Sequence, residues 1–276
     1  MIQIFFQFDF LRYSLYTGML IGLLAPLLGV FLVVRRLALI SDALSHITLS
    51  GIAFSLLLGR HYSYFAGLNP MYMGMAFSVG GAIFIERLRN VYRYYKELAI
   101  PIILSAGIGI GVVFISLANG FNNDLFHYLF GSVAAIRQSD FHMIVSITLF
   151  VLVMMLLFYK EWFFLSFDED QAVISGIPKK TLHFLFIIMV ALVISASMRI
   201  VGILLVSSLM TLPVASAMRW AKSFKQTFLY AILFSEISVI VGLFSAFHLD
   251  IAPGGTIVML NVIILLISLL LKRKGI

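Results

Sequence analysis

Long apolar stretches, separated by short polar segments, run along the whole chain. Such a stretch needs roughly 17–25 mainly apolar residues to cross a membrane as a helix. Several candidates are short, and 183–218 can also be interpreted as a bent hairpin of half-helices around Arg199. We therefore predict an all-α fold, a polytopic transmembrane helical bundle of about eight or nine spans. The candidate spans are 14–34, 37–58, 68–86, 100–118, 142–159, 183–198, 201–218, 227–247 and 256–271.

Basic residues gather between these stretches and alternate with connections that are poor in Lys and Arg, such as 59–67, 119–141 and 248–255. The positive-inside rule then places all the basic clusters and the C-terminus in the cytoplasm. Nine spans would put the N-terminus outside, with residues 1–12 as an interfacial segment or, alternatively, a frayed tail. The clusters are Arg35 and Arg36; Arg87, Arg89, Arg93 and Lys96; Lys160, Lys179 and Lys180; Arg219, Lys222 and Lys225; and Lys272, Arg273 and Lys274.

The composition agrees with a membrane protein. Hydrophobic residues make up 62% of the 276 residues, charged residues 11%, and the mean hydropathy is +1.09. We expect one transmembrane domain over residues 1–276, without a cleavable signal peptide. The net charge of +7 is spread over the connections rather than gathered in a patch, so we expect no nucleic-acid partner. The absence of cysteine excludes disulfides and thiolate metal sites.

Two ionisable residues interrupt the second span, in the segment "RRLALISDALSHITLSGIAF" (35–54). Asp42 and His46 are four positions apart and therefore share a helix face, with Ser45 beside them. An aspartate at the centre of a spanning helix costs on the order of 3 kcal/mol, so it persists only when it pairs, coordinates or lines water. Carboxylate and imidazole together suit a divalent first-row cation. The alternative is an Asp–His pair that only satisfies itself near the membrane boundary.

A second group of ionisable residues interrupts an apolar stretch in "LFSEISVIVGLFSAFHLDIAPGG". Glu236 lies midway along a predicted span, which makes it a candidate ligand. His248 and Asp250 lie at the outer end of that span, and for them a solvated loop is the stronger alternative. The chain has no G-x-x-x-x-G-K-[ST] phosphate loop, no H-E-x-x-H and no G-x-S-x-G, so these routes to ATP hydrolysis or proteolysis are excluded.

The cytoplasmic segment "FDEDQAVISGIPKKT" (167–181) combines three acidic residues with a short amphipathic run. This pattern predicts a brief helix along the membrane surface, stopped by Gly176 and Pro178. Such a helix can dock to a soluble partner. The alternative is a solvated loop helix with no partner.

The segment 35–54 resembles the R-R-x-A-L-x-x-D-A-L-S-H signature of permeases from ABC-type uptake systems that import zinc, manganese or ferrous iron. Further landmarks follow in the family's order: "LFGSVAAIRQSD", "FDEDQAVISGIP", "VGILLVSSLMTLPVASAMR" and "DIAPGGTIVML". Together they span nearly the whole chain. The chain thus resembles the membrane subunit of a bacterial metal importer, located in the cell membrane.

The resemblance implies a homodimer of permeases, fed by an extracellular metal-binding solute receptor and driven by a separate cytoplasmic ATPase subunit. The permease itself would have no ATP site and no permanently bound cofactor, only the transported Zn²⁺ or Mn²⁺. Asp42 and His46 match polar positions of the family's signature, while Glu236 and Asp250 are an extension by position and polarity. The segment at about 167–178 matches the coupling helix, with Asp168, Glu169, Asp170, Gln171, Ala172, Ser175 and Gly176 as coupling residues.

Three hypotheses stay open at this point. The leading one is the ATP-driven importer, with zinc expected ahead of manganese or iron on family resemblance alone, since carboxylate and imidazole accept each of them. The second is a proton-coupled secondary metal transporter, in which Asp42 and Glu236 relay protons. The third is an intramembrane enzyme that uses His46 and Asp42 as acid and base.

Overall fold

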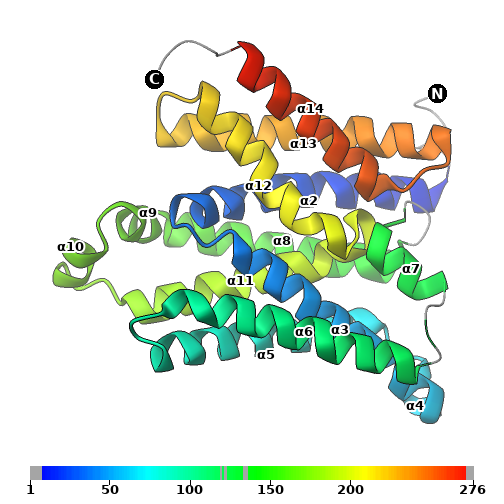
Figure 1. Cartoon of the computed structure of the whole chain (residues 1–276). Helices are drawn as coiled ribbons and strands as arrows, with labels where there is room; N and C mark the ends of the chain where they lie inside the picture. Colours follow the sequence, from blue (N-terminus) through cyan, green and yellow to red (C-terminus); the bar gives the residue numbers. More distant parts are fainter. Residues whose placement is uncertain (1–7, 119, 121–122, 133–135, 272–276) are drawn as a thin grey trace. The chain divides into compact units, whose positions relative to one another are not determined.

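The computed structural model describes residues 8–118, 120, 123–132 and 136–271 (Figure 1). All regular structure in these ranges is helical, which confirms the predicted all-α fold. The cluster Lys272, Arg273 and Lys274 and most of the predicted interfacial segment 1–12 lie outside the described residues. The long helices are α2 (Asp9–Val34), α3 (Leu39–His61), α5 (Pro70–Val91), α6 (Ala99–Leu117), α8 (Gln138–Leu157), α11 (Lys179–Val201), α12 (Ile203–Trp220), α13 (Phe224–Leu249) and α14 (Pro253–Leu271).

Each of the nine predicted spans coincides with one of these long helices. In the described part of the chain, seven helical segments are long and apolar enough to cross a membrane: α2, α3, Lys96–Leu117, α8, α11, α13 and α14. The other two predicted spans correspond to α5 and α12. The chain is therefore a multi-pass membrane protein, as predicted. The short helices are α4 (Ser63–Ala66), η1 (Lys96–Leu98), α7 (Asn123–Phe130), α9 (Tyr159–Phe167) and α10 (Glu169–Ile174).

The helices form two compact units, each built from separate stretches of the chain. The first unit contains Met1–Ala38, His127–Leu156 and Ser197–Ile276. Within it, α13 packs against α2, α12 and α14. Gly29 of α2 lies so close to α12 that a Cβ atom would be 2.0 Å from the carbonyl oxygen of Met210. This small residue lets the two helix backbones touch, as is common between membrane helices.

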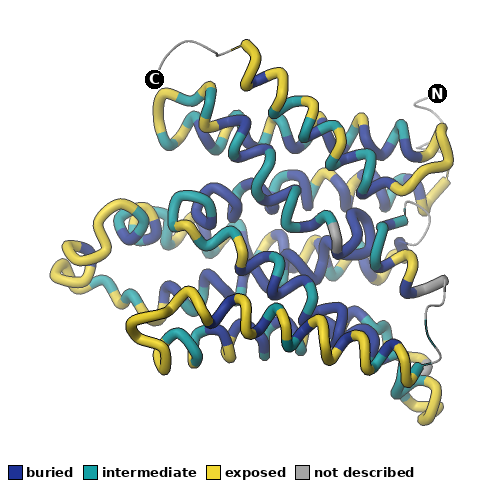
Figure 2. The backbone as a smooth tube through the Cα atoms, viewed as in Figure 1, coloured by how far each residue is buried: buried dark blue, intermediate teal, exposed yellow. Residues whose placement is uncertain are grey.

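The second unit contains Leu39–Phe126 and Leu157–Ala196, so α11 contributes to both units. In this unit α3 packs against α5 and α6. Ser50 of α3 donates a hydrogen bond to the carbonyl oxygen of Gly107 in α6, at 2.6 Å. The hydroxyl of Thr48 lies 3.4 Å from that of Ser195 in α11. Because three neighbouring helices enclose it, α3 is buried along most of its length (Figure 2).

A break separates α11 from α12 at Gly202, close to the interruption that the sequence predicts around Arg199. Gly202 has a φ of +80°, a left-handed conformation that favours glycine. A Cβ atom there would lie 2.4 Å from the carbonyl oxygen of Leu129, so the position also has no room for a side chain.

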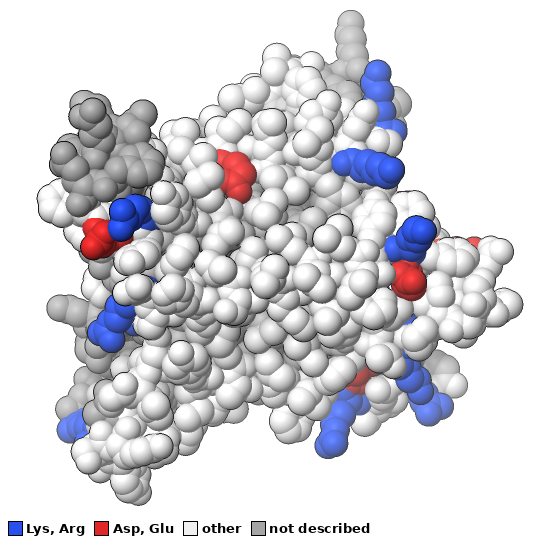
Figure 3. Space-filling view, turned by 180° about the vertical axis from the view of Figure 1, so that it is seen from behind, with Lys and Arg blue, Asp and Glu red and all other residues white. Residues whose placement is uncertain are grey.

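Charged side chains lie mainly at helix ends. Arg35 follows α2, and Arg219 lies in the last turn of α12. Figure 3 shows a face of the molecule on which residues other than Lys, Arg, Asp and Glu predominate. This distribution is typical of membrane-spanning helices. The proposed orientation in the membrane and the single-domain organisation stay predictions.

Candidate ion site and coupling segment

The candidate ion ligands Asp42 and His46 lie in the first two turns of α3. The turn before this helix is tight: Arg36 has a φ of 57°, and the N–H of Leu37 donates to the carbonyl oxygen of Leu32 at 2.7 Å. It places Asp42 in the first turn of α3, where a carboxylate interacts favourably with the helix dipole. His46 follows one turn later on the same face.

Asp42 and His46 differ from their neighbours in solvent access. Among the residues from Ile40 to Ala53, all of which the structure describes, these two are partly accessible and the others are buried. An aspartate and a histidine that stay accessible on an otherwise buried helix are expected to face a water-containing space rather than lipid.

The two side chains have no hydrogen-bond or ion-pair partner among the described residues. The backbone carbonyl oxygen of His46 accepts a hydrogen bond from Ser50, and the Asp42 carboxylate interacts electrostatically with the His46 imidazole. The two side chains are thus neighbours on one helix face, and their role as ion ligands stays a prediction. Ser45, which the sequence places in the same polar patch, is buried and donates to the carbonyl oxygen of Ser41 at 2.7 Å. Only the carboxylate and the imidazole of this patch are thus available to a ligand.

Glu236 lies in the middle of α13, against α2. Its Oε1 would be 3.1 Å from a Cβ atom at Gly22, so this glycine leaves the space that the carboxylate occupies. Its Oε2 is buried and has no hydrogen-bond partner among the described residues. An unpaired carboxylate oxygen inside a spanning helix is costly, so it gains from binding a proton or a cation.

Asp250 ends α13 in a left-handed conformation with a φ of 53°. It lines a pocket of about 410 Å³ together with His127 and the rings of Phe10, Phe247 and Pro253. Sequence reasoning missed His127, because it treated 119–141 only as a connection poor in basic residues. The polar signal was one histidine in the apolar run "NDLFHYLF".

His248, the neighbouring candidate, is exposed. Its Nδ1 lies 2.8 Å from the carbonyl oxygen of Phe244, one turn earlier in α13. This contact within its own helix fits the interpretation of a solvated residue at the helix end.

The four candidate ligands do not form one site. Glu236 and Asp250 are 14 positions apart (250 − 236), which is about 21 Å of helix at 1.5 Å per residue. One ion cannot contact both of them. Within either unit, no three His, Asp or Glu side chains of the described residues are grouped so that they could hold a metal. Within the described part of each unit, the candidate ligands are therefore sparse.

The predicted coupling segment contains the short helix α10. Its N-cap is Asp168, whose side chain accepts a hydrogen bond from the N–H of Gln171 at 2.9 Å. The helix ends at Ser175 and Gly176, which has a φ of +86°. The brief helix stopped by Gly176 is thus present, although it begins two residues earlier than the predicted run at Gln171.

Most of α10 is exposed, including Glu169, Asp170 and Gln171. Ile174 is 85% exposed and Val173 48%. Ala172 is the exception: it is fully buried, and its carbonyl oxygen accepts a hydrogen bond from the N–H of Ile177 at 3.1 Å. Ala172 therefore offers no exposed surface in this chain, and its role in contacting a partner stays a prediction. Val173 and Ile174, which the sequence did not single out, are the exposed apolar residues of this segment.

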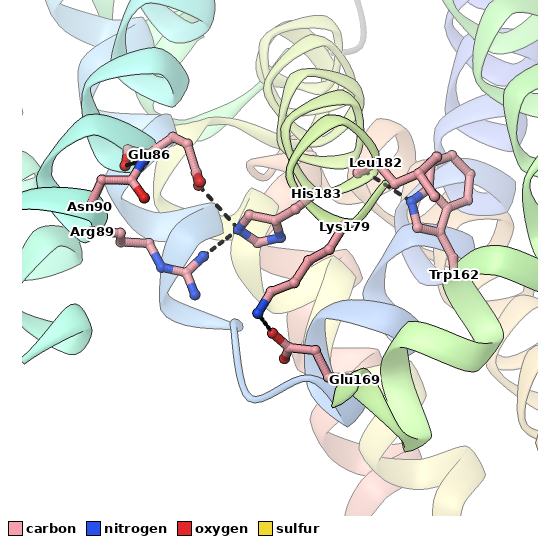
Figure 4. Close-up of polar contacts among 8 residues, drawn as sticks. All are labelled: Glu86, Arg89, Asn90, Trp162, Glu169, Lys179, Leu182 and His183. Carbon is pink, nitrogen blue, oxygen red and sulfur yellow. Dashed lines mark hydrogen bonds and ion pairs between the residues drawn. The ribbon is translucent and has the colours of Figure 1, made fainter. Parts of the chain in front are cut away.

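Two charged clusters, one buried and one partly buried, were not predicted. In the first unit, Arg199 pairs with Asp140, which has no exposed surface. In the second unit, His183 of α11 contacts Glu86 and Arg89 of α5 (Figure 4). The sequence counted Arg89 only as part of a cytoplasmic basic cluster.

The comparison with protein families identifies the chain. The sequence profile described as "ABC 3 transport family" matches residues 7–272. This chain belongs to the ABC 3 transport family. The family membership inferred from the order of the sequence motifs is thus confirmed.

Curated relatives of this ABC 3 family chain match it over nearly its full length. The manganese transport system membrane protein MntC of Listeria monocytogenes is 32% identical over 97% of this chain and 92% of its own. The manganese import system permease protein ScaB of Streptococcus gordonii is 31% identical over 99% of this chain and 97% of its own.

A solved structure is similar as well. In PsaBC from Streptococcus pneumoniae in complex with Fab, a chain superposes with a TM-score of 0.84 and 29% sequence identity. The match covers 97% of this chain and 94% of that one. The chain therefore shares its fold with that PsaBC chain.

Proposed function

We propose that this chain is the membrane permease subunit of an ATP-driven importer of a divalent metal ion, and that its cargo is Mn²⁺. The observation that supports this most is the state of Asp42 and His46. They are partly accessible on α3, where the neighbouring residues are buried, and neither side chain has a hydrogen bond or ion pair among the described residues. The carboxylate and the imidazole would contact the passing ion.

Manganese replaces zinc as the proposed cargo. The sequence alone led us to expect zinc first, but this preference has no support among the relatives, since MntC and ScaB are both named for manganese. Oxygen and imidazole nitrogen ligands accept either metal, so the ligand types at Asp42 and His46 are compatible with the change.

A sparse ligand set suits transport. An ion must bind strongly enough to enter and weakly enough to leave. Asp42 and His46 supply two ligands, and water molecules that the ion keeps would complete its coordination. Glu236 and Asp250 belong to the first unit, and we propose each of them as a further polar site that the ion contacts on its path.

The energy would come from a partner subunit. The exposed surface of α10, with Ile174 and Val173 among acidic residues, is available to a cytoplasmic ATPase. On the outer side, a metal-binding receptor would deliver the ion, and two copies of the permease would form the translocation unit. Membership in the ABC 3 family favours this arrangement over a proton-coupled secondary transporter or an intramembrane enzyme.

Uptake of radioactive manganese tests the proposal. Cells that lack their own manganese importers would express this chain together with the ATPase and the receptor of the proposed system. We expect the Asp42→Asn and His46→Gln variants to reach the membrane but to reduce uptake to the level of cells without the chain. The physical reason is the loss of one negative ligand and of one imidazole ligand, respectively.

Two matched controls separate ligand loss from general damage. Asp9→Asn removes an exposed aspartate from the first turn of another spanning helix, and His61→Gln removes an exposed histidine from the last turn of α3. Both controls should retain uptake. Normal uptake by Asp42→Asn would contradict the proposed role of Asp42, and uptake without any ATPase would contradict the ATP-driven scheme.

A further inference from the structure

The N-terminal end of α11 is tied to the coupling segment. The ammonium group of Lys179, the first residue of α11, pairs with the carboxylate of Glu169, the first residue of α10 (Figure 4). The indole N–H of Trp162 in α9 donates to the carbonyl oxygen of Leu182 at 3.1 Å. A displacement of α10 would therefore be passed to the first turn of α11 by the pair of Glu169 and Lys179, while Trp162 holds the same turn of α11 against α9.

The same end of α11 is also tied to α5 through His183. This imidazole is 6% exposed, and its Nε2 lies 3.3 Å from Oε2 of Glu86. Arg89 reaches the same nitrogen with its guanidinium group. Glu86 and Arg89 are three positions apart and lie near the C-terminal end of α5, so they hold the ring from one helix face.

The contact between His183 and α5 is kept whether the imidazole is neutral or protonated. A neutral Nε2 accepts a hydrogen bond from Arg89, whereas a protonated Nε2 donates one to Glu86. It cannot do both at once. Since both partners belong to α5, the imidazole stays bound to the same helix in either state.

From α5, close packing leads to the helix that carries Asp42 and His46. A Cβ atom at Gly81 of α5 would lie 3.0 Å from the side chain of Ile47. A Cβ atom at Gly74 would lie 3.0 Å from the side chain of Thr48. When two helices pack without cavities between them, a displacement of one helix also moves the other, because the closely packed side chains cannot be compressed. Thus α5 and α3 are expected to move together.

We propose that Glu86, Arg89 and His183 form a coupling joint, which passes the movement of α10 through α11 to α5 and so to α3. They are positioning residues, since none of them is proposed to touch the ion. The inference rests on the proposed function, in which a partner ATPase moves α10. It adds the residues that would carry this movement across the second unit.

Charge distinguishes the joint from a simple structural contact. Taking charged side chains out of water carries a desolvation penalty, so a purely structural contact is often better served by apolar or neutral groups. The indole of Trp162 is such a neutral contact on the same turn of α11. It therefore provides the matched control for a role in coupling rather than in folding.

The test measures how many Mn²⁺ ions are transported per ATP hydrolysed. The permease would be reconstituted in proteoliposomes with the ATPase and the receptor of the proposed system, and the rates of Mn²⁺ transport and ATP hydrolysis would both be recorded. For His183→Leu and Glu86→Gln we expect ATP hydrolysis to change by less than about twofold and the ratio to fall about fivefold or more, the lower range of coupling between linked sites. For Trp162→Phe we expect a lower unfolding temperature and an unchanged ratio.

The outcomes separate the two proposals. If the wild-type protein shows no ATP-driven uptake, the proposed function fails, and the joint fails with it. If the wild type is coupled and both joint variants keep its ratio, only the joint is overturned. Glu86→Gln keeps the side-chain volume, so this variant alone can test the joint if His183→Leu does not fold. If neither variant folds, the cluster is structural and the proposal is likewise overturned.

Discussion

The buried ion pair between Asp140 and Arg199 should dominate the stability of its part of the first unit. Asp140 has no exposed surface and Arg199 is 9% exposed. The Asp140 carboxylate also accepts the N–H of Arg137 at 3.0 Å, and the Arg199 guanidinium carbon lies 5.5 Å from the ring centre of Tyr128. Replacing Asp140 by Asn leaves the arginine charge buried without its counter-charge.

The size of the effect follows from this burial. Removing one partner of a buried ion pair costs about 3–5 kcal/mol. At roughly 2–4 °C per kcal/mol for a chain of this size, the unfolding temperature should fall by about 6–20 °C. The assay is thermal unfolding of the purified chain in lipid nanodiscs, followed by intrinsic fluorescence.

Two further variants show whether the charge is the cause. Asp9→Asn breaks an exposed ion pair with Arg12, and exposed pairs contribute about 1 kcal/mol or less, so the shift should not exceed about 4 °C. Asp140→Leu combined with Arg199→Met removes both buried charges and should restore most of the lost stability. The reasoning is refuted if Asp140→Asn shifts the unfolding temperature no more than Asp9→Asn does.

Two other predictions follow from close contacts and exposure. Gly29→Ala should sharply reduce the yield of folded protein, because its Cβ would lie 2.0 Å from the Met210 carbonyl oxygen. Gly80→Ala has open space around its Cβ and should fold normally. The measurement is the yield of folded protein after detergent extraction, determined by size-exclusion chromatography. In the naturally cysteine-free chain, Ile174→Cys should react with a maleimide in membranes, whereas Ala172→Cys should react only after denaturation, and equal labelling of both would contradict the described orientation of α10.

The spanning helices could be predicted because hydrophobic length is a local property of the sequence. The same holds for the spacing of Asp42 and His46, which depends only on the geometry of a single helix. The end of α10 was also predictable, since Gly176 provides a local stop signal. The solvent accessibility of Asp42 and His46 could not be predicted, because it depends on which neighbouring helices cover α3.

Contacts between distant segments could not be predicted from one sequence. Asp140 and Arg199 are far apart in the chain and pair only after folding, as do Glu86 and His183. The sequence gives no register for two packed helices, so it could not show that these charges neutralise each other. For the same reason Ala172 looked available, although the orientation of α10 buries it. Glu236 and Asp250 belong to one polar stretch of sequence, although they lie at the middle and at the end of the same helix, α13.

The most direct test of the account is to detect an imidazole nitrogen bound to the transported ion. Pulsed electron paramagnetic resonance of Mn²⁺, trapped in the assembled transporter without ATP hydrolysis, reports nitrogen in the first coordination shell. The account predicts a histidine nitrogen coupling in the wild-type protein and in His61→Gln, and its loss in His46→Gln. A nitrogen coupling that persists in His46→Gln, or that is missing from the wild type, would contradict the claim that Asp42 and His46 hold the ion.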